Sequence, residues 1–271
     1  MQSRDDLNCF RGSSLAADLP DPNPCLLGII RDWMQKRGHD LPPRWKIDPP
    51  DERFAQYCAD AYQSAQHTPA EFRTRESYRT FIRELHEQFQ LFSDAGYTFS
   101  LWRVDGQPYR DSREMRADVL RHHRLFVYPT SGMSQDHPLA QQAMPGWTWN
   151  DVFRAVHDIV AHAATGFQFG PTGEDNAFRF HATLHSAGAI PALATETRLQ
   201  NCWVNFGSHL RDAGGALIRP SEPGYLPPST RPYAAQKAFA PVAGAIDCML
   251  WRLFVERKLS CGQLQRGPVP N

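Results

Sequence analysis

The run His157-Asp158-Ile159-Val160-Ala161-His162 sets two histidines five residues apart in an apolar stretch, and it decides the fold that we expect. The carboxylate of Glu196 follows two predicted helices later. Two imidazoles and one carboxylate are the ligand set of an open-sided Fe(II) site, in which three protein ligands occupy one face and leave the other free. His157, His162 and Glu196 therefore predict a metal site carried by helices.

The spacing of the two histidines does not suit a regular helix. Side chains five residues apart differ by about 140° in direction at 3.6 residues per turn, so the two rings converge only where the helix ends or loosens. The run Ala163-Ala164-Thr165-Gly166 permits such an ending just after His162. On geometry alone, a pair of hydrogen-bonded core histidines is an equally good interpretation.

His157 and Glu196 both lie on apolar stripes of their predicted helices, and we expect them to point inward. A carboxylate on such a stripe is costly unless a cation or hydrogen bonds compensate for its burial. Two compensations stay open for Glu196. One is a metal ion, and the other is a salt bridge to an arginine such as Arg198.

Apolar periodicity along the chain predicts a mainly α protein with a small β element. We expect residues 1–50 to form an irregular N-terminal segment with a short helix, and residues 51–271 to form a single mainly helical catalytic domain. The helices are expected at 25–37, 51–66, 70–95, 150–165, 173–187, 190–206 and 234–258, and the strands at 97–104 and 125–128.

Start and stop residues mark the three helices around the histidines. Asn150 and Thr172 are the expected N-caps of the first two helices, and Pro191 suits the first turn of the third. Glycines are expected to end the three helices, at Gly166, Gly188 and Gly207.

The composition excludes some partners. The chain carries 29 basic and 29 acidic residues, and a neutral chain has no electrostatic reason to seek nucleic acid or an anionic membrane. It has no apolar stretch near the roughly 20 residues of a membrane span, and its first residues contain no apolar signal core. Six cysteines without a C-x-x-C pair predict reduced thiols and a cytoplasmic protein.

The order of these residues resembles the catalytic core of the aromatic amino acid hydroxylases. That family has a helix with two histidines separated by four residues, a following helix, and a third helix that brings a glutamate; the similarity spans about residues 155–206. It implies an aromatic-amino-acid-hydroxylase-like helical core with His157, His162 and Glu196 as the iron ligands. Asp158 and Ala161 stand where the family usually has Glu and Gly, and no segment matches its pterin contacts. The region also resembles uncharacterised bacterial and phage proteins with an HD…H…GE…H…TETR pattern.

A rival ligand set lies in the predicted helix 173–187. His181 and His185 are four residues apart and share a face, and Glu174 lies two turns before His181 on the same side. They predict a second metal site, or the true one with Glu196 added. Glu174 also has a simpler interpretation, because a carboxylate in a first turn gains typically 0.3–1 kcal/mol from the helix dipole. A di-iron site usually needs more carboxylates than these.

Three further residues are candidates for catalysis. Asp158 lies one turn before His162, where it either orients a ligand or occupies a solvated helix position. His181 either lines the active site or packs in the core. Arg198 suits a bidentate clamp on a substrate carboxylate, and it suits a structural ion pair equally well.

Together these features predict a non-haem Fe(II) monooxygenase or hydroxylase that uses O2 and a small-molecule substrate. The expected substrate, an aromatic amino acid or a related metabolite, comes from the resemblance. An external or substrate-derived reductant is expected in place of a pterin. The first alternative is a zinc-dependent hydrolase or lyase, since the same ligands suit zinc. The second is a non-enzymatic helical binding protein with structural histidines.

Overall fold

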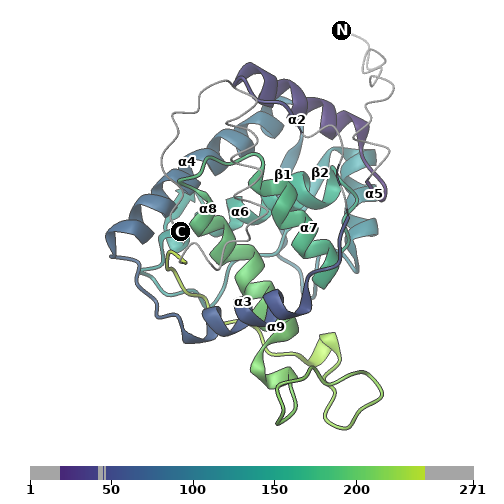
Figure 1. The fold of residues 1–271 in the computed structure, drawn as a ribbon. Coiled ribbons are helices and arrows are strands. Elements are labelled where there is room, and N and C mark those ends of the chain that lie inside the picture. Colours follow the sequence, from purple (N-terminus) through teal and green to yellow (C-terminus); the bar gives the residue numbers. More distant parts are fainter. Residues whose placement is uncertain (1–18, 42–44, 46, 242–271) are drawn as a thin grey trace, which may run out of the picture.

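The structure, a computed structural model, describes residues 19–41, 45 and 47–241 as a mainly helical protein with two small sheets (Figure 1). The α-helices are α2 (Pro24–Lys36), α3 (Glu52–Ser64), α4 (Phe72–Asp94), α5 (Ser112–His122), α6 (Trp149–His157), α7 (Pro171–Ala182), α8 (Ile190–Ala194) and α9 (Gln200–Phe206). The strands are β1 (Thr98–Leu101), β2 (Arg124–Val127), β3 (Gln142–Met144) and β4 (Trp147–Thr148). Short 3-10 turns are η1 (Pro138–Ala140), η4 (Ser208–Leu210) and η5 (Pro228–Thr230).

Two helices are widened by π-helical segments. Helix α6 continues directly into the π-helix η2 (Asp158–Ala163), and α8 passes through the π-helix η3 (Thr195–Leu199) into α9. The predicted helices at 150–165 and 190–206 are therefore confirmed as continuous helical paths. The spacing of His157 and His162 required only that the helix end or loosen, and it did not identify a π-helix.

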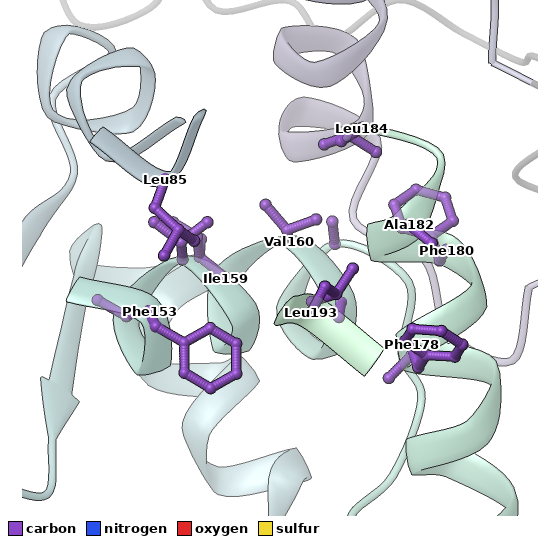
Figure 2. Close-up of a cluster of buried hydrophobic side chains, with 14 of the residues drawn as sticks. Leu85, Phe153, Ile159, Val160, Phe178, Phe180, Ala182, Leu184 and Leu193 are labelled. Atoms are coloured by element: carbon purple, nitrogen blue, oxygen red, sulfur yellow. The ribbon is translucent and has the colours of Figure 1, made fainter. Parts of the chain in front are cut away.

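The core forms where α4, α6 with η2, α7 and α8 meet. Figure 2 shows Leu85 of α4 and Phe153 of α6 beside Val160 of η2, with Phe178 of α7 and Leu193 of α8 closing the cluster. These five side chains are at most 6% exposed. Helix α2 adds buried apolar side chains to the same core, so this short N-terminal helix packs with the main domain. At the edge of the molecule, α3 lies along α9 (Figure 1).

The predicted β element is confirmed as a parallel pair. Strand β1 pairs with β2 in the register Thr98↔Arg124 to Leu101↔Val127, and α5 connects the two strands. Helix α5 was not predicted, because only Ser112, Met115 and Val119 of its residues are buried, which leaves little apolar periodicity. The short antiparallel pair of β3 and β4 then leads into α6.

Two predicted N-caps are wrong. Thr148, not Asn150, caps α6, because its hydroxyl accepts from the N–H of Asp151 while the Asp151 carboxylate accepts from the N–H of Thr148. Helix α7 begins at Pro171 after Gly170, so Thr172 lies inside it. Pro191 and Gly207 lie at the start and end of their helical path as predicted.

Two further expectations are corrected. Residues 234–241 of the predicted last helix are not helical, and residues 242–258 lie outside the described part of the chain. Cys25 is disulfide-bonded rather than reduced. The sequence did not predict this bond, because a disulfide requires two cysteines to lie close together in the fold, which their spacing along the chain does not show. Cys58 and Cys202 are buried and form no disulfide, in line with the expected reduced thiols. Among the described helices, none has the length and apolar character that crossing a membrane requires.

Gly166 follows the helical path of α6 and η2, and its backbone conformation and close surroundings suit only glycine. Its φ is +86°, and a Cβ there would lie 2.6 Å from backbone atoms of Asp21. The segment before α2 is also tied to this end, because the Asn23 N–H donates to the Ala164 carbonyl at 2.9 Å. The close approach lets the chain turn back sharply after η2.

We expect Gly166→Ala to lower the free energy of unfolding by roughly 2–4 kcal/mol. About 1–2 kcal/mol comes from the left-handed backbone, and the rest from the displaced Asp21 backbone. Urea denaturation measures the loss. Gly106→Ala is the matched control, because Gly106 has φ +83° with open space around it. Equal losses in the two variants would mean that the contact with Asp21 does not restrict this position.

Candidate metal centre

The π-helix η2 resolves the awkward spacing of His157 and His162. His157 is the last residue of α6 and His162 lies in η2, where the Ala164 N–H donates to the carbonyl of Ile159, five residues back. Each turn of a π-helix closes over five residues rather than four, so side chains five apart come to the same side. The two rings lie edge to face with centroids 5.1 Å apart.

Glu174, in the first turn of α7, completes a cluster with the two histidines. Its carboxylate oxygens lie 3.7 Å from His157 Nε2 and 3.5 Å from His162 Nε2. One ligand atom from each of the three residues lies within 4.8 Å of the others. In the part of the chain that the structure describes, this is the one group of three or more such residues spaced to hold a metal ion.

Gly173 allows Glu174 to reach the histidines. A Cβ at Gly173 would lie 1.8 Å from the carbonyl oxygen of Gln168, so the loop that follows η2 passes directly against the start of α7. Only a residue without a side chain fits between them. The helix dipole also favours a carboxylate in this first turn, which was the simpler interpretation of Glu174 in the sequence.

Hydrogen bonds leave the Nε2 atoms of both histidines facing the carboxylate. His162 Nδ1 lies 3.0 Å from the Phe167 carbonyl, which only accepts, so this nitrogen carries the proton. His157 Nδ1 is engaged by His181 Nδ1 at 3.2 Å. In a neutral ring that has its proton on Nδ1, Nε2 carries a lone pair. A lone pair that faces a carboxylate is repelled unless a cation lies between them. The site therefore has the polarity of a cation site.

The charges of the cluster respond to each other. Burial disfavours the charged form of His162, but the Glu174 carboxylate outweighs it and raises the pKa of His162 to about 9. Burial likewise opposes ionisation of Glu174, yet His162 and His157 hold its pKa far below the usual range. Without a metal, a proton on His162 is the cation that this carboxylate retains. Metal binding must displace it.

A cavity of about 410 Å³ opens beside the cluster. Glu174 and Asp158 lie in its wall, so the group of potential ligands has one side open to a space that accommodates a small molecule. Burial raises the pKa of Asp158, with His162 and His157 acting in the opposite direction. Most of the remaining wall comes from the β1–α5 connection, β2 and the segment before α7. Its residues are Gln107, Pro108, Tyr109, Met115, Phe126, Val127, Tyr128, Arg154 and Phe169.

Glu196 does not lie with His157 and His162; Glu174 takes that place. The Glu196 carboxylate accepts hydrogen bonds from the Tyr78 hydroxyl and from Gln200 Nε2, the latter at 3.1 Å. His137 Nε2 also lies 3.3 Å from it. The cost of burying this carboxylate is therefore offset by hydrogen bonds. The sequence left open a metal ion or a salt bridge to an arginine such as Arg198, and Arg198 instead pairs with Asp175.

The other predicted site residues fall into two groups. His181 and His185 lie directly behind His157, with their Nε2 atoms 3.2 Å apart, so the rival ligand set divides and only Glu174 joins the cluster. Arg198 is 2% exposed, and its Nε donates to Asp175 at 2.8 Å. This is the structural ion pair of the two interpretations offered by the sequence.

Comparison with protein-family models, with curated proteins and with solved structures finds no match to this chain. The resemblance of residues 155–206 to the hydroxylases therefore stays a prediction. The described residues themselves support one cluster of ligands, its hydrogen-bonded surroundings and an adjoining cavity.

We expect Glu174→Gln to weaken binding of Zn²⁺ or Co²⁺ by more than about 100-fold, since loss of a ligand exceeds the 10–100-fold cost of losing an outer partner. Isothermal titration of metal into the metal-free protein measures this. Glu196→Gln is the matched control and should change the affinity less than about threefold. The reverse ranking would restore Glu196 as the third ligand.

The His162–Glu174 pair should make the stability of the metal-free protein depend on pH. The folded pKa of His162, about 9, lies above its ordinary value of 6.5. The stabilisation is thus complete below pH 6.5 and is lost as the pH rises through about 9. Denaturation in the presence of a chelator should show the free energy of unfolding falling over this window in the wild type. Glu174→Gln should flatten the fall, and an unchanged slope would exclude the pair as its source.

Proposed function

We propose that this chain is a non-haem Fe(II)-dependent monooxygenase or hydroxylase that uses O2 to oxidise a small aromatic substrate. The observation that carries the proposal is that Glu174, which lies beside His157 and His162, also lies in the wall of a cavity with aromatic sides. Two histidines and one carboxylate with open positions are the ligand set of Fe(II) oxygenases. Two of these ligands are those expected from the sequence, and Glu174 replaces Glu196 as the third.

The residues present fit a divalent metal. Both Nε2 atoms face the carboxylate, at 3.7 Å from His157 and 3.5 Å from His162, and all three ligand atoms lie within 4.8 Å of each other. In this proposal His157, His162 and Glu174 hold Fe(II), which supplies the activation of O2 when it is bound. The side of the metal that faces the cavity would then be open to the substrate and O2.

The cavity wall fits a planar apolar molecule that carries an acidic group. Tyr109, Phe126 and Phe169 contribute aromatic rings, which pack well against an aromatic substrate. The Phe169 ring also lies edge to face with the His162 ring, with centroids 5.0 Å apart. It therefore lies next to His162, one of the proposed ligands.

Arg154 is the cation of the cavity wall. Its Nη1 donates to the Tyr128 carbonyl at 2.9 Å, which fixes the guanidinium at the cavity and leaves further N–H donors for a carboxylate. Asp158, one turn further along the same helix, adds a carboxyl group close to the ligands. An amino-acid-like substrate would thus have its acidic group held by Arg154 and its ring held among the aromatic side chains.

The proposal is tested by loading the protein with Fe(II) under anaerobic conditions, then adding O2, ascorbate as an external reductant and a panel of small aromatic acids. We expect O2 consumption to rise at least tenfold with one class of aromatic acid, with a hydroxylated product detected by mass spectrometry. Glu174→Gln should abolish this stimulation, whereas Glu76→Gln, a surface control, should retain it. Purification with stoichiometric zinc and no iron would overturn the proposal in favour of a zinc hydrolase or lyase.

A further inference from the structure

A row of buried polar side chains extends from the candidate ligand His157 away from the cavity. His157 Nδ1 lies 3.2 Å from His181 Nδ1, and His181 Nε2 lies 3.0 Å from Gln88 Oε1 and 3.2 Å from His185 Nε2. His185 Nδ1 then lies 2.9 Å from the Glu84 carboxylate. His181, His185 and Gln88 are at most 2% exposed, so water does not compete for their hydrogen bonds.

The direction of these hydrogen bonds is set at the Glu84 end. The Glu84 carboxylate also accepts from the backbone N–H of Ser186 at 3.0 Å and from its hydroxyl at 2.5 Å. An ionised carboxylate has no proton to donate, so His185 Nδ1 must carry the proton that they share. A neutral His185 then has a lone pair on Nε2.

The same reasoning passes along the row, one ring at a time. The His185 lone pair is faced at 3.4 Å by the amide nitrogen of Gln88, which only donates, and at 3.2 Å by His181 Nε2. His181 Nε2–H also meets Gln88 Oε1, which only accepts. His181 therefore has its lone pair on Nδ1, and His157 Nδ1 donates to it. This leaves the lone pair of His157 on Nε2, the atom that faces Glu174.

We propose that Glu84, His185, Gln88 and His181 are positioning residues that fix His157 in the tautomer able to bind a metal. The inference rests on the proposed function in one respect, namely that His157 is a ligand. If His157 carried its proton on Nε2, its Nδ1 would have a lone pair. That lone pair would then face the lone pair on His181 Nδ1. If His181 instead carried its proton on Nδ1, the lone pair on its Nε2 would face Gln88 Oε1. Each arrangement leaves buried polar groups without a partner, which the observed geometry avoids.

The test compares the affinity of the metal-free protein for Zn²⁺ across variants of the row. Glu84→Gln can either accept from or donate to His185, so it removes the fixed direction, and His181→Leu removes the acceptor for His157. We expect each to weaken Zn²⁺ binding by about 10–100-fold, the usual effect of losing an outer partner of a metal-bound histidine. His181→Gln, which restores an acceptor oxygen, should recover most of the affinity. Glu87→Gln, an exposed control on the same helix, should leave it unchanged.

A second measurement needs no variant. In the Zn²⁺-loaded wild type, histidine ¹⁵N chemical shifts should report protons on Nδ1 of His157 and His185 and on Nε2 of His181. The opposite tautomer of His181, or equal Zn²⁺ affinities for wild type, Glu84→Gln and His181→Leu, would overturn the role of the row while leaving the proposed function intact. A wild type that binds no metal would overturn the proposed function itself.

Discussion

The five-residue turn at the end of α6 is the constraint on which the site depends. In an α-helix, His157 and His162 would point in directions about 140° apart, and no single ion could contact both. The switch to i→i+5 hydrogen bonds between Asp158 and Ala163 turns both rings toward α7. π-helical turns are rare in proteins, and a large share of those that occur lie at functional sites. Apart from Asp158, the residues of η2 are buried, and its apolar side chains pack into the central core.

Glu196, which is buried, and Glu174, which is partly exposed, have opposite surroundings. Glu196 accepts hydrogen bonds from Tyr78 and Gln200, which donate protons that they already carry. Glu174 faces the Nε2 atoms of two histidines, whose other nitrogens are engaged elsewhere. The first carboxylate is satisfied by neutral donors, whereas the second requires a cation. This difference, rather than burial itself, separates a structural carboxylate from a ligand.

The sequence predicted most of the helices, a small β element and two of the three residues of the cluster, because apolar periodicity and glycine stops are local signals. It placed Glu196 with the two histidines, and Glu174 only in the rival ligand set. Glu196 lies on a clear apolar stripe, whereas Glu174 lies in a first turn where the helix dipole already explains a carboxylate. The decisive signal for Glu174 is its neighbour Gly173, whose close contact with Gln168 depends on how the loop returns. The π-helical winding of residues 158–163 and 195–199 is also set by packing across elements, and no residue type in either run marks it.

The row behind His157 was visible in the sequence only as two histidines four residues apart. Their partners, Glu84 and Gln88, lie on α4, roughly 100 residues earlier in the chain. Glu84 and Gln88 are also four residues apart, on α4, whereas His181 lies on α7 and His185 lies in the turn after α7 ends at Ala182. Long-range pairings of this kind cannot be recognised from one sequence.

The return loop between η2 and α7 also has a consequence for how the site assembles. His157, His162 and Glu174 belong to one uninterrupted segment, in which a tight glycine turn and a short loop bring the last of the three back onto the first two. Closing a short loop costs less chain entropy than closing a long one, and contacts between residues near in sequence form early in folding. The ligand cluster can therefore form from a single local unit, while the row that orients His157 is completed only when α4 docks. Affinity for a metal and correct orientation of its ligand would then arise at different stages of folding.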